Sequence, residues 1–360
     1  MAKALKNLYN EIYIELLSEN ISVTDPSFKG EVFKQEVFSD KWNSLELKER
    51  MHHIAEALNT TLPYTYPNAI KILKITFNRM NHAYMLENMI FQDFVSIYGL
   101  EMFDTSMNAL ACFTIGSSSE FAIREFILTY PDETMKQMRV WAEDENEHLR
   151  RLASEGCRSR LPWAIALPAF KNDPTLVIEI LKTLKDDSSA YVRKSVANNL
   201  NDISKDNPDI LKTLVTSWIG HSKQRDAILK HGCRTLLKNS DTEVLELFGF
   251  RKLKGIEIKN FIFTQEIKMG EELAFHFDIL SKEKLGKLRV EFALYFLRKN
   301  DKHNKKVFKI SEADIQSTKK SISKKYSFKP ISTRVYYRGE QRLSIIINGT
   351  IFKEVAFMLS

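Results

Sequence analysis

The sequence is poor in the residues that support disulfide, metal and nucleotide chemistry. Its 360 residues include only three cysteines, Cys112, Cys157 and Cys233, which are too few and too far apart for a disulfide framework or a metal clip. There is no glycine-rich phosphate-binding loop, no nucleophile elbow and no paired-histidine zinc motif. We therefore expect no metal and no cofactor, and a catalytic site here would depend on carboxylates, aromatic rings and positive charge.

Long apolar runs are also absent. No window reaches the roughly 18 consecutive apolar residues of a membrane span, and residues 1–20 alternate polar and apolar positions at helical spacing, unlike a signal peptide. The 23 Phe, 12 Tyr and 4 Trp are enough for a large core. We expect a globular protein of the reducing cytoplasm that makes no contact with a membrane.

The net charge of +7 is unevenly distributed. Residues 251–360 contain 24 basic and 12 acidic residues, a net charge of +12, whereas residues 1–250 contain 29 basic and 34 acidic residues, a net charge of −5. This difference predicts two domains with different surfaces. A basic module suits an anionic partner, either nucleic acid or a membrane surface, although a lysine-rich surface can also serve solubility alone.

Residues 1–250 predict a succession of helices. Apolar residues recur at the i, i+3, i+4 and i+7 spacing of amphipathic helices, and prolines occupy positions expected of first helical turns. Pro131, Pro174 and Pro208 are separated by 43 and 34 residues, and each is followed after ten residues by a bulky apolar side chain. This period predicts repeated helix pairs.

The second helix of each expected pair is basic and repeats an apolar-Arg step. Leu149-Arg150 and Val192-Arg193 lie 43 residues apart. Helix pairs with this period favour a HEAT-like solenoid. A tetratricopeptide repeat fits less well, because its aromatic pattern is missing.

The pattern changes to short strands near residue 254. Seven segments have strand character: 256–263, 272–280, 287–297, 306–310, 333–337, 342–349 and 351–359. Asn348-Gly349 predicts a tight hairpin. We therefore expect a mainly α chain, with a HEAT-like repeat domain over 1–250 and a basic immunoglobulin-like β-sandwich over 255–360. Lysines are expected in and around its central loops: Lys302, Lys305, Lys306, Lys309, Lys319, Lys320, Lys324 and Lys325.

The densest polar stretch, residues 139–163, contains two candidate site residues. Glu155 lies one helical turn from Arg151 and Arg158, so that a carboxylate is surrounded by cations; a surface ion pair with Arg151 would also explain it. Trp163 follows a Leu-Pro turn, where an indole is easily presented to solvent, although a lone tryptophan is more often part of the core.

Two further carboxylates, Glu120 and Asp202, have structural explanations of their own. Ser117 and Glu120 match a capping box at the start of a helix, and Asp202 fits a solvated helix end. When the repeats are aligned on Arg150 and Arg193, however, Glu120, Glu155 and Asp202 fall on three consecutive second helices. Such helices line the concave groove of a HEAT-like stack. The rest of the groove is expected to be basic and to suit the phosphates of a nucleic acid, through Arg124, Arg151, Arg158, Arg160, Arg193, Lys194, Arg225 and Lys230.

Residues 1–250 resemble a known family. The strings RRLASEGCRSRLPWA, SSSEFAIREFI, YVRKSVANNLNDISKDNP and LELKERMHHIAEAL are similar to the AlkC branch of the HEAT-like DNA alkylation repair glycosylases, and the appended β-sandwich resembles the AlkC subset with an immunoglobulin-like domain. One departure is Ser159, where many relatives have proline.

The resemblance implies a monofunctional DNA glycosylase of base excision repair. It would remove cationic N-alkylated bases, 3-methyladenine foremost and also 3-methylcytosine, without a deep pocket for a flipped base. The family's active-site residues map onto Glu120, Glu155, Trp163 and Asp202. The implied partner is double-stranded DNA containing alkylated bases, bound by a monomer associated with a bacterial nucleoid.

Two other functions are compatible with a helical repeat. A non-catalytic HEAT scaffold would not need converging carboxylates in its groove, so Glu155 and Asp202 count against it. A HEAT-repeat module that binds damaged or branched DNA without cleaving the glycosidic bond is the stronger alternative.

Overall fold

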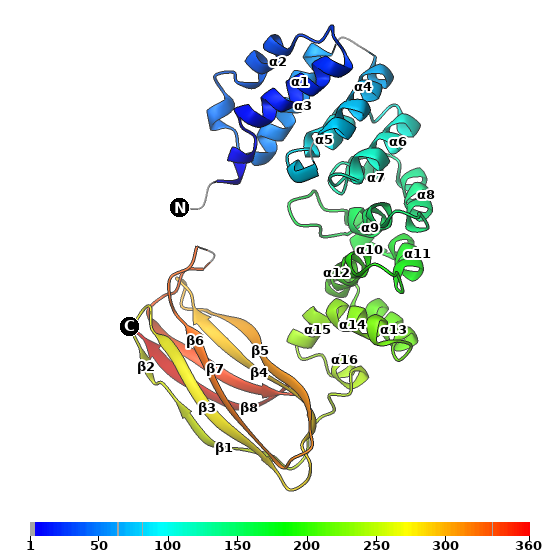
Figure 1. Ribbon diagram of the computed structural model, residues 1–360. Helices are drawn as coiled ribbons and strands as arrows, with labels where there is room; N and C mark the ends of the chain where they lie inside the picture. Colours follow the sequence, from blue (N-terminus) through cyan, green and yellow to red (C-terminus); the bar gives the residue numbers. More distant parts are fainter. Residues whose placement is uncertain (1–3, 63–64, 81, 333) are drawn as a thin grey trace. The chain divides into compact units, whose positions relative to one another are not determined.

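The computed structural model describes residues 4–62, 65–80, 82–332 and 334–360. Helices form the chain up to residue 247 and strands the chain from residue 256 (Figure 1). The α-helices are α1 Glu11–Thr24, α2 Gly30–Val37, α3 Leu47–Thr61, α4 Tyr66–Arg79, α5 Met89–Tyr98, α6 Phe103–Thr114, α7 Ile123–Thr129, α8 Pro131–Ala142, α9 Glu147–Gly156, α10 Pro168–Asn172, α11 Thr175–Leu184, α12 Ala190–Asp206, α13 Pro208–Trp218, α14 Lys223–Gly232, α15 Arg234–Lys238 and α16 Thr242–Leu247. Short 3-10 helices cover Leu5–Leu8, Trp42–Ser44 and His82–Tyr84.

The helices pack as a HEAT-like repeat, as expected. Helix α9 packs against α8 and α12, and α12 packs against α14, while α8 packs against α11. The second helices α9, α12 and α14 therefore form one layer, and the first helices α8 and α11 form another. Helix α12 shows why the sequence folds this way, because Val192, Val196, Leu200 and Ile203 form a single fully buried stripe at helical spacing.

Consecutive repeats share the same turn chemistry. Asn146 caps α9 and Ser189 caps α12, each accepting a hydrogen bond from the backbone two residues later. The Arg150 guanidinium donates to the carbonyls six and five positions before it, at 2.9 and 2.8 Å, and Arg193 donates to the equivalent carbonyls at 2.6 and 2.8 Å. The repeated arginine thus holds the turn that precedes its own helix.

The chain divides into two compact units. One comprises Met1–Asn207 with Gly220–Gly232, and the other comprises Pro208–Ile219 with Cys233–Ser360. The strands of the second unit begin at Ile256, after the last helix ends at Leu247. Two domains over 1–250 and 255–360 remain a prediction.

The strands form an immunoglobulin-like sandwich of two sheets. Its strands are β1 Ile256–Phe263, β2 Glu266–Ile267, β3 Glu272–Ser281, β4 Gly286–Leu297, β5 His303–Ile315, β6 Lys319–Ser327, β7 Gly339–Ile347 and β8 Thr350–Leu359. One sheet has the order β1-β3-β6 and the other β2-β8-β7-β4-β5, with antiparallel pairs except for β2 and β8. Buried residues of both sheets, including Phe277, Phe292 and Ile345, form one core.

Two strand expectations need correction, and one turn is confirmed. The segment 333–337 is not a strand: residue 333 lies outside the described residues, and 334–337 form only an isolated bridge from Arg334 to Ile331. Conversely, Lys319–Ser327 is strand β6 and not a loop. Its single buried side chain, Ile322, leaves almost no period-2 hydrophobic signal. The hairpin at Asn348-Gly349 joins β7 to β8 with positive φ at both residues.

Candidate active site

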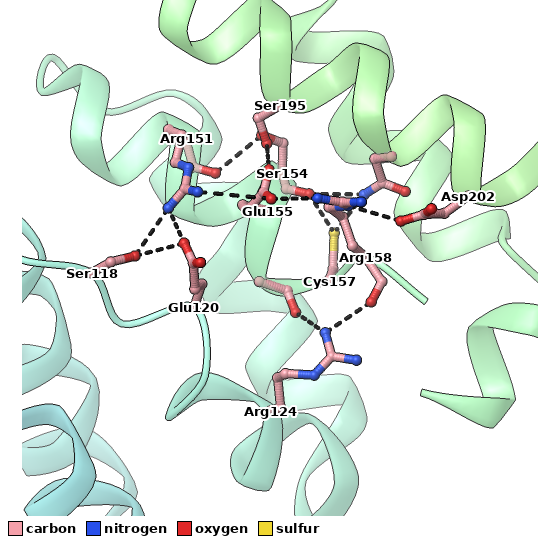
Figure 2. A network of polar contacts seen from close by, with 12 residues as sticks. Ser118, Glu120, Arg124, Arg151, Ser154, Glu155, Cys157, Arg158, Ser195 and Asp202 are labelled. Carbon is pink, nitrogen blue, oxygen red and sulfur yellow. Dashed lines mark hydrogen bonds and ion pairs between the residues drawn. The ribbon is translucent and has the colours of Figure 1, made fainter. Parts of the chain in front are cut away.

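The three predicted carboxylates lie in one polar network of the helical unit (Figure 2). Glu155 is in the last turn of α9 and is 5% exposed, and Asp202 is in α12 and is 1% exposed. Glu120 is half-buried in the turn before α7. Three successive segments of the repeat thus bring these acids together.

A single guanidinium bridges the two most buried acids. Arg158 Nη1 donates to Glu155 Oε1 at 2.5 Å, and its Nε donates to Asp202 Oδ2 at 2.8 Å. Burial alone would lower the pKa of Arg158, but the two carboxylates outweigh it and the pKa is raised. The sequence suggested that Arg158 contacts phosphate; the structure instead places it, 7% exposed, between the two acids.

The second oxygen of each buried carboxylate also has a partner. Ser195 donates to Glu155 Oε2 at 2.6 Å and in turn accepts from Ser154, also at 2.6 Å. Lys205 donates to Asp202 Oδ1 at 3.0 Å. Every carboxylate oxygen is engaged, which fixes the orientation of both acids before any substrate binds.

These positions overturn two simpler explanations. Glu155 does lie 3.7 Å from Arg151, but at 5% exposure it is not part of a surface ion pair. Asp202 is not a solvated helix end, because α12 continues to Asp206 and the Asp202 side chain is almost wholly buried.

Glu120 forms an ion pair with a different arginine, Arg151. Arg151 Nη1 donates to Glu120 Oε2, and Ser118 donates to the same oxygen at 2.7 Å. The alternative of a capping box is wrong, because α7 starts at Ile123 without a side-chain cap and the Ser117 hydroxyl donates to the backbone oxygen of Met85. Arg151 therefore links Glu120 to Glu155.

Arg124 is not where a phosphate can reach it. Its side chain is fully buried and donates to the backbone oxygens of Gly156, Arg158 and Ile165 at 3.0, 2.8 and 2.7 Å. Burial lowers its pKa to about 10. Arg124 thus holds the chain that leaves α9, which carries Arg158 and the Trp163 loop, and the expected contact with DNA does not fit this placement.

Trp163 projects into solvent, with 68% of its surface exposed. Its φ is +64°, a left-handed conformation uncommon for a bulky residue and typical of functional loops. Lys48, from α3, donates to the Trp163 carbonyl and lies 4.4 Å from the centre of the Phe121 ring. Sequence reasoning missed Lys48, since nothing near residue 48 indicates contact with a loop 115 positions away.

The other predicted phosphate contacts differ in their exposure and in the hydrogen bonds that their side chains form. Arg160 forms two hydrogen bonds with Asp206, at 2.7 and 2.5 Å, and Arg225 forms two with Asp186. The Arg193 guanidinium holds its own turn. Lys194 is exposed and Lys230 half-exposed.

Among the residues that the structure describes, no group of three or more His, Cys, Asp or Glu side chains is arranged to hold a metal ion. Within the same residues, no helix is both long enough and apolar enough to cross a bilayer.

Comparisons with known proteins agree with this architecture. A family model described as "DNA alkylation repair enzyme" matches residues 114–236, and one described as "Uncharacterised protein YhaZ, C-terminal Ig-like domain" matches residues 257–360. The chain is 41% identical over 357 residues to YhaZ of Bacillus subtilis (strain 168), with 99% of each chain covered. The structure of Pseudomonas fluorescens alkylpurine DNA glycosylase AlkC, bound to DNA containing an abasic site analog, matches with a TM-score of 0.95 and 32% identity, covering 99% of this chain and 100% of that one.

Proposed function

Because the chain belongs to the AlkC family of alkylpurine DNA glycosylases, we propose that it hydrolyses the N-glycosidic bond of cationic N-alkylated bases in double-stranded DNA, 3-methyladenine foremost and 3-methylcytosine as well. The observation that carries the proposal is the pair of buried, preoriented carboxylates, Glu155 and Asp202, joined by Arg158. A module that only binds DNA has no need to bury two acids in this way.

The chemistry of the substrate explains why carboxylates are sufficient for catalysis. N3-alkylation gives the base a positive charge and makes it a good leaving group, so the enzyme need not protonate it. The remaining barrier lies in the cationic sugar and the attacking water. Glu155 and Asp202 stabilise the oxocarbenium-like sugar and orient or deprotonate the water, with Glu120 alongside.

Trp163 supplies a second kind of stabilisation. Its exposed indole offers a π face to the deoxyribose as positive charge develops there, an attraction of the cation–π type. Arg124 and Lys48 hold the two ends of the segment that carries this indole, through the carbonyls of Ile165 and Trp163.

Substrate access requires that the outer cations move. Lys205 and Arg151 are the more exposed partners of the acids, with side chains 37% and 16% exposed. Phosphate groups of bound DNA compete for both cations, so binding the backbone releases Asp202 Oδ1 and Glu120 for the sugar. Arg158 stays in place and holds the Glu155 and Asp202 carboxylates in their positions relative to each other.

The protein is proposed to hold DNA by its backbone, as a monomer associated with the bacterial nucleoid. In this proposal Glu120, Glu155, Trp163 and Asp202 act on the sugar without a deep pocket for an extruded base, and selectivity rests on the lability of the lesion. Basic residues of the sandwich contribute to binding of the DNA phosphates. They include the strand β6 lysines Lys319, Lys320, Lys324 and Lys325.

The test is release of free base from alkylated DNA. Wild-type protein is expected to release 3-methyladenine, while Asp202→Asn and Glu155→Gln lose most of the activity. Matched controls lie on the same helices: Asp206→Asn on α12 and Glu147→Gln on α9 remove exposed or partly exposed acids outside the network. Release that survives both site substitutions contradicts the site assignment.

The alternative function, a non-catalytic module that binds damaged or branched DNA, makes a different prediction. It requires tight binding to such DNA without release of any base by the wild-type protein. The same assay therefore decides between the two functions.

A further inference from the structure

A pocket of about 450 Å³ adjoins the carboxylate network within the helical unit. Helix α3, helix α5 and the segment from Ser118 to Ala122 form its walls, together with Ala164 and Ile165. Ser118 lines the pocket and also donates to Glu120, and Ala164 directly follows Trp163. The pocket therefore begins where the proposed reaction takes place, although none of the four predicted site residues lines it.

Among the described residues, one buried acceptor of this pocket lacks a hydrogen-bond donor, and a second, partly buried one is paired only with a histidine. Gln92 is 2% exposed; its amide nitrogen donates to the Phe113 carbonyl at 2.9 Å, but its Oε1 accepts no hydrogen bond from the described residues. Asp93 Oδ2 likewise accepts none of sound geometry there, and its nearest cation, His52 Nδ1, is 3.3 Å away. Burial raises the pKa of Asp93 to about 6.

Three other charged side chains of the pocket are already engaged. Glu49 accepts a hydrogen bond from the backbone of Glu46 at 2.8 Å, and Glu56 lies within 4.0 Å of Lys41. Lys48 donates to the Trp163 carbonyl. An acceptor without a donor in a buried site is unfavourable unless a ligand or water supplies one, so Gln92 Oε1 marks where a donor belongs, next to the carboxylate of Asp93.

The remaining walls suit a flat, weakly polar ligand. Met51, Met89, Phe121 and Ile165 contribute thioether, aromatic and aliphatic surface. Aromatic rings and methionine sulfur pack well against planar heterocycles, and pockets of this size hold small molecules.

We infer that this pocket receives the amino-bearing N-alkylated base that the reaction releases. The exocyclic amine has two hydrogens, which match Gln92 Oε1 and Asp93 Oδ2, while the alkyl group and the ring face contact Met89 and Phe121. The inference rests on the proposed function for the identity of the ligand. It concerns the free base after cleavage, so the glycosidic bond can be cut without an extruded base.

The test measures binding of free 3-methyladenine to the full-length protein without DNA, by calorimetric titration. Saturable binding is expected, and Gln92→Leu is expected to weaken it at least tenfold, because the leucine removes the acceptor at similar volume. The matched control is Gln35→Leu on the exposed face of α2, which should leave the affinity unchanged. Equal affinity of all three proteins would overturn the inference.

A comparison of ligands keeps the test valid if Gln92→Leu does not fold. In 3-methylhypoxanthine a carbonyl replaces the exocyclic amine, so it presents an acceptor to Gln92 and Asp93. The wild-type protein should bind it at least tenfold more weakly than 3-methyladenine. Similar affinities, or no saturable binding of either base, would mean that the pocket holds only water.

One more variant separates this inference from the proposed function. Glu155→Gln should lose excision but bind the free base like the wild type, since Glu155 does not line the pocket. Excision by a wild-type protein that binds no free base overturns the inference alone. Base binding by a wild-type protein that excises nothing overturns the proposed function, and with it the assignment of the ligand as a product.

Discussion

Asp202→Asn changes charge at the site with little change in shape. The asparagine keeps an oxygen that can accept from Arg158 Nε, now at 2.8 Å from Asp202 Oδ2, and Arg158 retains its 2.5 Å contact with Glu155. Helix α12 keeps its buried stripe of Val196 and Leu200. The variant should therefore fold and differ from the wild type chiefly by the loss of one negative charge.

The size of the effect follows from the position of that charge. Asp202 is 1% exposed, so water screens its interaction with a nearby cation poorly. Removing one preorganised electrostatic group of this kind costs about 3–4 kcal/mol of transition-state stabilisation, or roughly 10²–10³-fold in rate. DNA binding should stay equal or become tighter, because the lost charge repels phosphate.

The assay is single-turnover release of 3-methyladenine, with DNA affinity measured separately. Asp206→Asn, four residues further along α12, is the control: Asp206 pairs with Arg160 outside the network and its loss should change the rate less than about threefold. A rate for Asp202→Asn within about tenfold of the wild type, or an equal loss in Asp206→Asn, would refute the catalytic role of Asp202.

Three further predictions test the network, the pocket and the sandwich. Arg158→Met leaves two buried acids without their shared cation and should destabilise the helical unit by about 3–5 kcal/mol, measured as a lower Tm. The control Arg160→Met removes a partly exposed ion pair and should cost less than about 1 kcal/mol. Similar losses of stability in the two variants would contradict the bridging role of Arg158. Asp93 has a pKa raised from 3.8 to about 6, so the folded state holds its proton more tightly and the stability contributed by this group falls as pH rises between those values. Asp93→Asn, facing His52, Lys48 and Glu125, should raise stability by up to about 3 kcal/mol at pH 8 and by nearly nothing below pH 4 in thermal melts; the opposite trend would show that its ion pair with His52 dominates. Lys324→Ser, at an exposed position of β6, should weaken DNA binding at every sequence and reduce the salt slope by about one; an unchanged slope would exclude it from the phosphate contacts.

The amino-acid sequence alone determined the local features of this protein. The prolines and the apolar-Arg step predicted individual helices, because these signals act within one or two helical turns, and their repetition after 43 residues predicted that the helices form pairs. Asn348-Gly349 likewise predicted its hairpin. The positions of Glu120, Glu155 and Asp202 on successive repeats followed from the same period.

The tertiary structure decided what each side chain does there. Arg124, Arg151 and Arg158 are indistinguishable in sequence as basic residues near acids. In the structure, Arg124 donates to backbone carbonyls in the core, Arg151 pairs with Glu120, and Arg158 bridges two buried acids. Lys48 reaches a loop 115 residues away. Partners of this kind depend on distances between segments remote in the chain, and burial depends on every neighbour at once, so the charge and the spacing of residues predicted the place of the site but not its internal pairing.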